Sequence, residues 1–361
     1  MKIRIDNKEI FVGAGKTILD AAKKAGITIP TLCHRDGIEP YSSCMVCMVK
    51  DNRTNNYIPS CTALAQDGME IDASGEKVIE LRKKAVELLL LEHRAECEAP
   101  CRIVCPAGYN IPVMNRLLQE GKIEEAVELA GKEITTPEII CIDCQGYCEN
   151  ACRRKKIDVP VSIRNIMLFV SHNINKGSNA DNPVNEDIKN ALEQAGKKPV
   201  NPVRKKFSSR TGRLEDNEQN EWLKECRGDG TRFREIPDFK TAGLEAENCM
   251  HCDCRASDDC SLRNVAVSLE IKDPSGKVIN APVAKKINRK TGLIFENAKC
   301  IKCGLCVRIC EDTKEEPALC FINRGFVSII SEPLTEGFDD ILQTKADFCV
   351  DVCPTGALSK L

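Results

Sequence analysis

The sequence predicts an α+β protein built from several small domains, each organised around cysteine side chains. The chain has 361 residues, a length that allows two or three domains. It has only ten Phe, four Tyr and one Trp, so its apolar cores must be small. It also has 23 cysteines, and most are bunched at intervals of two or three residues. These features indicate domains that depend on cysteine ligation as well as on apolar packing.

Composition and charge exclude several classes of function. Fifty-two Lys and Arg against 54 Asp and Glu give a net charge of −2, which argues against a nucleic-acid-binding protein. The longest apolar run, about 86–91, is interrupted only by Glu87 and is far shorter than the roughly 18 residues of a membrane span. Charged and apolar residues alternate over 1–10, unlike a secretory signal. We therefore expect a cytoplasmic protein without a membrane segment.

The cysteines are predicted to bind metal. Structural disulfides do not persist in a reducing cytoplasm, so the abundance of cysteine needs another explanation. Thiolates are soft ligands that select zinc or iron–sulfur clusters, and closely spaced cysteines are typical of chelating turns. Each cysteine group is therefore a candidate metal site.

The hydrophobic pattern predicts the elements in chain order. Residues 1–75 have strands over 2–5 and 9–12, a helix over 17–25 and a strand over 45–50, which together favour a β-grasp domain. Ser74 is expected to cap a helix over 76–92, whose apolar face would contain Val78, Leu81, Ala85, Leu88 and Leu89.

The rest of the chain is predicted as three further segments. Helices over 110–119 and 122–130 place 76–170 in a helical domain. Residues 171–245 are rich in Asn, Lys, Glu, Gly and Pro and are interpreted as a linker that wraps a partner, with one short helix over 186–195. Residues 246–361 form the C-terminal domain, with a β-hairpin within 277–295.

The first cysteine group consists of Cys33, Cys44, Cys47 and Cys61. Four thiolates, most of them from one loop, are what a [2Fe-2S] cluster needs. The stretches 13–22 and 26–33 and the Cys44-Met-Val-Cys47 turn resemble the N-terminal [2Fe-2S] domain of the large iron–sulfur subunit of complex I and of iron-only hydrogenases. The resemblance implies one [2Fe-2S] cluster on these four cysteines.

The second and third groups supply eight candidate ligands for two cubane clusters. The stretches 101–112 and 144–154 resemble the two-cluster N-terminal domain of the glutamate synthase small subunit and dihydropyrimidine dehydrogenase, in which the two segments share their clusters. That family's early cysteine pair is missing here, and the start of the segment instead resembles the His-x-x-x-Cys motif of the complex I subunit. The resemblance implies one [4Fe-4S] cluster on His93, Cys97, Cys101 and Cys152. It implies another on Cys105, Cys144 and Cys148, with Cys141 as the fourth ligand.

The fourth group is Cys249, Cys252, Cys254 and Cys260. Four cysteines in so short a segment can close on one cubane or on one zinc ion, and the Cys-Asp-Cys gap is unusual for either. The sequence therefore leaves [4Fe-4S] and zinc as alternatives at this site.

The fifth group resembles a bacterial two-cluster ferredoxin. Cys300, Cys303 and Cys306 would share a [4Fe-4S] cluster with Cys353, which precedes a proline. The companion cluster would use Cys310 and Cys349, but Gln343 and Ala346 stand where its other two cysteines belong. That cluster is predicted to be damaged or lost, with Cys320 or Cys226 either recruited as a replacement or left as an ordinary thiol. The whole chain would thus carry one [2Fe-2S] cluster and three to five [4Fe-4S] clusters.

The function predicted from these sites is electron relay. No Gly-x-Gly-x-x-Gly motif follows a strand, and no flavin domain is evident, so neither NAD(P) nor flavin is expected on this chain. The resemblances imply an iron–sulfur subunit of a cytoplasmic, NAD(P)-linked oxidoreductase complex of the hydrogenase, formate dehydrogenase or transhydrogenase type, with electron bifurcation as one mode. The implied partners are a diaphorase-like subunit that binds flavin and NADH, and a second redox subunit or a ferredoxin.

Two other functions are open to the sequence. A scaffold stapled by zinc would use the same cysteines without redox chemistry. A self-sufficient oxidoreductase would need a flavin on the isolated chain, and the sequence offers no catalytic acid, base or nucleophile for it.

Overall fold

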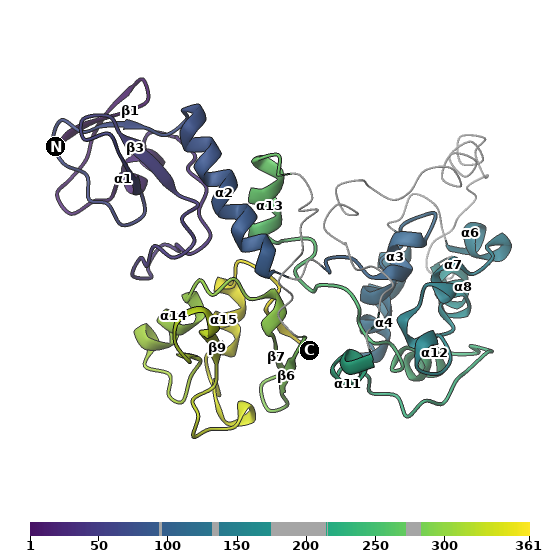
Figure 1. The fold of residues 1–361 in the computed structure, drawn as a ribbon. Helices are drawn as coiled ribbons and strands as arrows, with labels where there is room; N and C mark the ends of the chain where they lie inside the picture. Colours follow the sequence, from purple (N-terminus) through teal and green to yellow (C-terminus); the bar gives the residue numbers. More distant parts are fainter. Residues whose placement is uncertain (94–95, 132–136, 175–213, 215, 272–282) are drawn as a thin grey trace, which may run out of the picture. The chain divides into compact units, whose positions relative to one another are not determined.

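The computed structural model describes residues 1–93, 96–131, 137–174, 214, 216–271 and 283–361 (Figure 1). The chain forms two compact units. Unit 1 combines Met1–Arg94 with Asp258–Leu361, and unit 2 is Ala95–Ser257. The predicted C-terminal domain 246–361 is therefore divided, because residues 246–257 pack into unit 2.

The N-terminal part of unit 1 is a mixed five-stranded sheet with one helix, α1 (Ile18–Lys24). The sheet order is β2-β1-β5-β3-β4, and only the β1–β5 pair is parallel. Thr17 and Asp20 form a reciprocal capping box, which starts α1 as the sequence predicts. The strands are β1 (Lys2–Ile5), β2 (Lys8–Phe11), β3 (Met48–Asp51), β4 (Asn56–Pro59) and β5 (Glu70–Asp72).

Helix α2 (Glu76–Glu92) has the predicted bounds but a different cap and a different buried face. Gly75, not Ser74, is the N-cap, because Asp72 accepts hydrogen bonds from the backbone amides of both residues and holds the turn. Leu88 is 55% exposed, so the predicted apolar face is wrong there. Arg82 is buried instead, since its Nε donates to the carbonyl of Met48 at 2.9 Å. The buried stripe is Val78, Arg82, Val86 and Leu90.

The C-terminal part of unit 1 combines two small sheets with helices that carry cysteines. The antiparallel sheet β10-β7-β6 includes a β6–β7 hairpin, as predicted, although 277–282 lie outside the described residues. A second sheet pairs β8 with β9. The elements are α13 (Ser261–Ser268), β6 (Lys285–Asn288), β7 (Leu293–Glu296), η3 (Asn297–Lys299), α14 (Leu305–Thr313), β8 (Cys320–Ile322), η4 (Gly325–Val327), β9 (Ile329–Ser331), η5 (Phe338–Asp340), α15 (Ala346–Val352) and β10 (Leu358–Lys360).

Unit 2 is helical, as the sequence predicts for 97–170. Its core packs α4, α5 and α8 together, and α12 contacts α4 and α8. The elements are α3 (Pro100–Val104), α4 (Ile111–Gln119), α5 (Ile123–Gly131), α6 (Pro137–Asp143), α7 (Tyr147–Asn150), η1 (Arg153–Lys156), α8 (Ile163–Ile174), η2 (Asp216–Glu218), α11 (Gln219–Leu223) and α12 (Phe239–Ala246).

Part of the interval expected to be a linker, 171–245, belongs instead to the packed body of unit 2. Trp222 on α11 is 1% exposed and packs with Leu214 and Met250. Ala242 on α12 is fully buried, and Glu245 accepts hydrogen bonds from the backbone amides of Ser162 and Phe233. Leu214, Trp222 and Ala242 do not make a periodic apolar pattern, which is why the composition favours a linker. The helix predicted over 186–195 lies outside the described residues.

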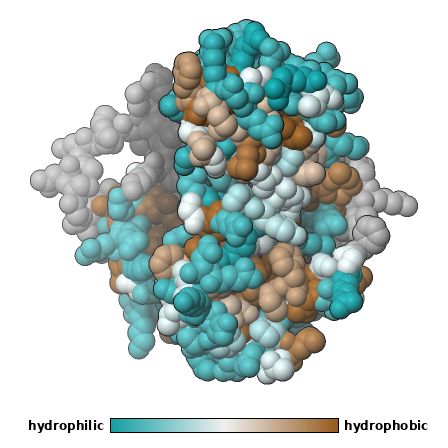
Figure 2. All heavy atoms as spheres, turned by 90° about the vertical axis from the view of Figure 1, so that its left-hand side faces the viewer, coloured by the Kyte–Doolittle hydropathy of each residue, from teal (hydrophilic) through white to brown (hydrophobic). Residues whose placement is uncertain are grey.

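The surface mixes polar and apolar residues. Figure 2 shows apolar patches scattered among hydrophilic residues on the face it draws. Within the described ranges, no helix is at once long enough and apolar enough to cross a lipid bilayer.

Candidate iron–sulfur sites

The first predicted group is assembled in the N-terminal part of unit 1. Cys33, Cys44, Cys47 and Cys61 are all buried. The backbone N–H of Cys44 donates to Cys33 Sγ at 3.5 Å, and the Sγ atoms of Cys47 and Cys61 are 3.4 Å apart. The hydrogen bond between Cys47 and Cys61 lowers the pKa of the Cys47 thiol to about 7, so Cys47 is closer to the thiolate form that metal binding requires. Four converging sulfurs fit the predicted [2Fe-2S] cluster.

The fifth group also comes together, around a cavity of about 300 Å³ in unit 1. The four predicted ligands, Cys300, Cys303, Cys306 and Cys353, all line it. The backbone N–H of Lys302 donates to Cys300 Sγ at 3.3 Å, and Lys302 has a left-handed backbone with φ 54°. This donor set and space fit a [4Fe-4S] cluster, in which backbone amides stabilise the cluster sulfurs.

The loops of these two groups contact each other within unit 1. The Arg308 guanidinium on α14 donates from Nη2 to the carbonyl of Cys33 at 2.8 Å. Ser43 Oγ donates to the carbonyl of Cys303 at 3.4 Å. Arg308 also lies over the Tyr41 ring, 5.6 Å from its centroid. The sequence analysis missed this contact because Arg308 stands in an unremarkable position between two cysteines.

A four-cysteine group in unit 2 matches the prediction for the third group. Cys105 ends α3, Cys141 lies on α6, Cys148 lies on α7, and Cys144 lies between those two helices. Burial, together with the neighbouring Cys105 and Cys144, raises the pKa of Cys141 to about 12. Arg164 holds the α6 end in place, because its Nε donates to the carbonyl of Cys141 at 2.6 Å. The four thiols are therefore neighbours.

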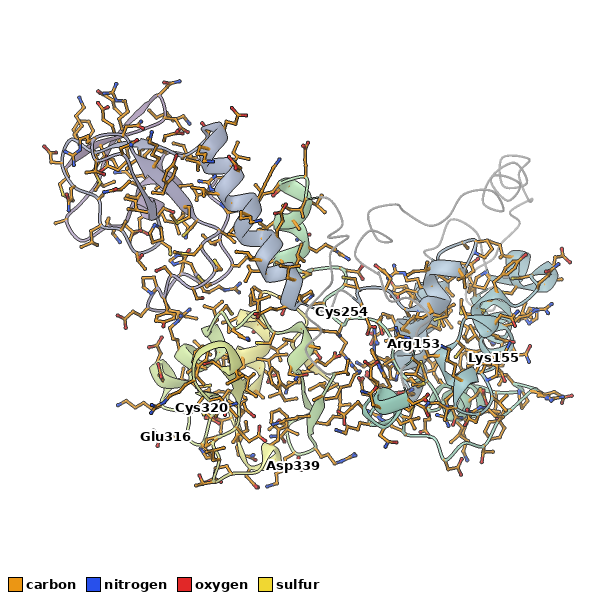
Figure 3. The ribbon with its side chains drawn as sticks, in the orientation of Figure 1. Arg153, Lys155, Cys254, Glu316, Cys320 and Asp339 are labelled. Atoms are coloured by element: carbon orange, nitrogen blue, oxygen red, sulfur yellow. The ribbon has the colours of Figure 1, made fainter. Side chains whose placement is uncertain are left out.

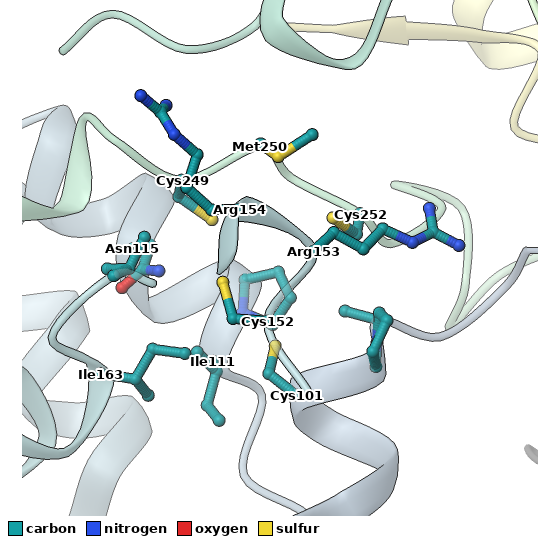
Figure 4. A pocket seen from close by; sticks show the side chains of 14 residues that line it. Cys101, Ile111, Asn115, Cys152, Arg153, Arg154, Ile163, Cys249, Met250 and Cys252 are labelled. Carbon is teal, nitrogen blue, oxygen red and sulfur yellow. The ribbon is translucent and has the colours of Figure 1, made fainter. Parts of the chain in front are cut away.

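The second group is assembled differently from the prediction. Cys101 on α3 and Cys152 before η1 line a cavity of about 360 Å³ in unit 2. The other two cysteines on its wall are Cys249 and Cys252, from the fourth predicted group (Figure 4). All four sulfurs face the space between them in this view.

The remaining members of the second and fourth groups fall in both units. His93 and Cys260 belong to unit 1, and Cys97 and Cys254 belong to unit 2. His93 is buried, and its Nδ1 bonds to the carbonyl of Lys299 at 2.9 Å, so Nε2 is the ring atom that the predicted ligation would use. Cys260 Sγ contacts the carbonyl of Pro354 at 3.9 Å, and the amide of Cys254 donates to the carbonyl of Cys97 at 3.1 Å. The four-ligand sets predicted with these residues stay predictions.

Four cysteines are assigned to no cluster by the sequence analysis, and they do not all lie together in the structure. Cys310 and Cys349 are buried, with their Sγ atoms 3.4 Å apart. Cys320 lies on β8 (Figure 3), and Cys226 Sγ donates to the carbonyl of Cys249 at 3.2 Å. Of these thiols, only Cys310 and Cys349 form a pair in the described structure.

Three family models match separate parts of the chain. Residues 1–76 match a 2Fe-2S iron–sulfur cluster binding domain. Residues 92–179 match dihydropyrimidine dehydrogenase domain II, a 4Fe-4S cluster domain. Residues 293–359 match the ferredoxin-like domain of NADH-quinone oxidoreductase subunit 3. The chain is thus a multidomain iron–sulfur protein with one 2Fe-2S domain and 4Fe-4S domains.

Its relatives are subunits of NAD(P)-linked oxidoreductases. It is 36% identical over 115 residues to the NADPH-Fe(3+) oxidoreductase subunit alpha of Geobacter sulfurreducens, a match that covers 32% of this chain and 13% of that protein. It is 28% identical over 154 residues to the NAD-reducing hydrogenase HoxS subunit gamma of Cupriavidus necator, covering 41% of this chain and 64% of the relative.

A solved NAD+-reducing [NiFe]-hydrogenase in the H2-reduced state has a similar fold, with a TM-score of 0.51 at 16% identity. The alignment covers 99% of this chain and 86% of that one. The resemblances stated from the sequence are confirmed by these comparisons at the level of the iron–sulfur domains.

Proposed function

We propose that this chain relays single electrons through iron–sulfur clusters within an NAD(P)-linked oxidoreductase complex. The observation that carries the proposal is the contact between the two cysteine loops of unit 1. Arg308 follows Cys306 on the chain and bonds to the backbone of Cys33, so one side chain joins the two cluster-binding loops. Electron transfer needs two centres close together, and this hydrogen bond joins the loops that carry the two candidate sites.

Unit 2 supports the same function. Helix α3 carries Cys101 and ends at Cys105, and these two thiols face different cysteine groups. Negative charge on Cys148, which belongs to the Cys105 group, also raises the pKa of Cys101, so the two groups are near each other. One short helix thus holds two candidate cluster sites together.

The proximity of their cysteines supports three proposed ligand sets. The [2Fe-2S] cluster uses Cys33, Cys44, Cys47 and Cys61. One [4Fe-4S] cluster uses Cys300, Cys303, Cys306 and Cys353, and another uses Cys105, Cys141, Cys144 and Cys148. When bound, these clusters supply one-electron redox chemistry, while the chain sets their distances and potentials.

The partners and setting are proposed from the relatives. A diaphorase-like subunit that binds flavin and NADH would exchange electrons with this chain, and a second redox subunit or a ferredoxin would complete the complex. We place this complex in the cytoplasm, where thiols remain reduced. Electron bifurcation at a partner's flavin is one mode of such a complex.

The experiment is iron, acid-labile sulfide and zinc analysis of anaerobically purified protein, with low-temperature EPR after reduction. The relay predicts one [2Fe-2S] signal and several [4Fe-4S] signals, with magnetic interaction between the two clusters of unit 1. Stoichiometric zinc without sulfide would instead establish the zinc-stapled scaffold. Flavin on the isolated chain would favour a self-sufficient oxidoreductase.

A further inference from the structure

We propose that Cys249 and Cys252 are the third and fourth ligands of a [4Fe-4S] cluster whose other ligands are Cys101 and Cys152. The inference rests on the proposed iron–sulfur function and changes one of its ligand sets. In this ligand set Cys249 and Cys252 replace His93 and Cys97. The set also divides the group Cys249–Cys260, which the sequence analysis treats as one site.

The first argument is the similarity of the two four-cysteine cavities. The cavity of Cys300, Cys303, Cys306 and Cys353 lies within the matched ferredoxin-like domain. The cavity in unit 2 is also lined by four cysteines (Figure 4). A cluster of several iron atoms needs its ligands around a space, whereas a single zinc ion needs them about 2.3 Å from one point. Among the described residues, no three His, Cys, Asp or Glu side chains converge closely enough for a single metal ion.

The second argument is the backbone of the two Cys-x-x-Cys turns. In Cys249-Met-His-Cys252 the third residue, His251, has φ 45°, and in Cys300-Ile-Lys-Cys303 the third residue, Lys302, has φ 54°. Both are non-glycine residues in the left-handed region, which is uncommon. In the ferredoxin-like domain the backbone N–H of Lys302 donates to the Cys300 thiol at 3.3 Å. In unit 2, burial raises the pKa of the Cys249 thiol and the backbone of His251 opposes that rise. The two turns therefore share a left-handed third residue whose backbone faces the first cysteine.

The third argument is that helix α4 holds the Cys249 segment against Cys101 and Cys152. Arg116 makes a bidentate ion pair with Asp253, at 2.8 and 2.7 Å, and both side chains are largely buried. Gln119 donates to the carbonyl of Ala246 at 2.6 Å and bonds to the ring of His251. These contacts fix the backbone on both sides of Cys249 and Cys252.

The fourth argument is a buried donor that points toward the sulfurs. Asn115, also on α4, is 1% exposed, and its Nδ2 has no hydrogen bond of normal geometry among the described residues. It lies beside Cys249 in the cavity wall, and its amide lowers the pKa of the Cys249 thiol, although burial dominates and raises that pKa to about 12. Buried donors rarely stay unsatisfied, and hydrogen bonds to cluster sulfurs are a common way to satisfy them.

The arrangement also explains the departure of this chain from the two-cluster family. The expected early cysteine pair is absent before Cys101. A Cys-x-x-Cys pair from the downstream segment stands next to Cys101 and Cys152 instead. The missing pair is thus supplied from a different part of the chain.

The test asks whether the two pairs of cysteines ligate one cluster or two. We would compare Cys101→Ala/Cys152→Ala, Cys249→Ala/Cys252→Ala and the combined quadruple variant, each as full-length protein purified anaerobically. If one cluster is shared, each double variant loses about four irons and four sulfides, and the quadruple variant loses the same amount. A loss of about eight irons from the quadruple variant, with four from each double, would overturn the proposal. Undiminished iron in either double variant would also overturn it.

Single serine variants keep the test valid if the double variants disturb unit 2. Cys101→Ser and Cys249→Ser are expected to change the g-values or midpoint potential of the same reduced-cluster EPR signal. His93→Ala is expected to leave that signal unchanged, and Cys226→Ala is the matched control, since its thiol contacts the Cys249 carbonyl outside the cavity wall. Changes in two different signals would overturn the proposal. The [2Fe-2S] signal reports on folding, and a chain without any iron would instead overturn the proposed function.

Discussion

Removing the Trp222 ring is expected to release iron from unit 2 much faster than from unit 1. Trp222 is 1% exposed, packs against Met250 between Cys249 and Cys252, and lies 4.7 Å from the Arg153 guanidinium. Truncating a buried tryptophan to alanine costs about 3–5 kcal/mol. If that energy is lost from the closed loop, local opening becomes about 10²- to 10³-fold more frequent or more, at roughly 1.36 kcal/mol per tenfold change.

The assay is anaerobic iron release to a chelator, followed by the decay of each cluster's EPR signal. Trp222→Ala should accelerate the decay of the EPR signal that responds to Cys249→Ser. The [2Fe-2S] signal should decay at its wild-type rate. Trp222→Phe keeps a ring beside Arg153 and should stay within about tenfold of wild type. Leu334→Ala, at a side chain that is 90% exposed, is the control for truncation as such. A wild-type release rate in Trp222→Ala would refute the view that this residue closes the loop.

Three further outcomes follow from the same structure. Arg308→Met removes the cation that joins the two loops of unit 1. We expect the [2Fe-2S] midpoint potential to fall by tens of millivolts in an EPR titration. An unchanged potential would show that solvent screens the charge. Cys310→Ala/Cys349→Ala should keep the wild-type iron content, because only two thiols meet there, and a loss of about four irons would show a further cubane. Asp253→Asn leaves a buried Arg116 without its anion, so the free energy of unfolding should fall by about 3–5 kcal/mol. Iron release from unit 2 should then accelerate. Wild-type release kinetics would exclude this ion pair as a support of the loop.

Local patterns explain how much of the fold was predictable. The bounds of α2 follow from an uninterrupted run of helix-forming residues, which is visible in the sequence. Its cap depends on the Asp72 side chain, which the sequence analysis did not identify. The buried face of α2 depends on a carbonyl of β3 that accepts from Arg82, and no helical periodicity encodes that contact. The same holds for Trp222, whose burial depends on Met250 from a distant segment.

For the cysteine sites, too, contacts within one short segment are predictable from the sequence, and contacts between distant segments are not. Cys300, Cys303 and Cys306 reach one cavity because they share a single turn and helix start, so spacing alone predicts them. Spacing also groups Cys249 with Cys260, yet these residues belong to different units. Spacing therefore identifies a chelating turn but does not identify its partner cysteines.

Proton release gives an independent way to choose between the ligand sets. Burial raises the pKa of Cys249 to about 12, and it raises the pKa of Cys101 well above its ordinary value, so both thiols are protonated at neutral pH before a cluster binds. Cluster binding must remove these protons, since a cysteine ligates iron only as its thiolate. Reconstitution of the Cys101 cluster should therefore be faster at pH 8.5 than at pH 7. With His93 as a ligand in place of a cysteine, one thiol proton fewer would leave, because burial lowers the His93 pKa to about 4 and the imidazole is already neutral. The number of protons released per cluster, measured in weakly buffered solution for wild type and for Cys249→Ser, thus distinguishes a four-thiolate site from a site with one histidine.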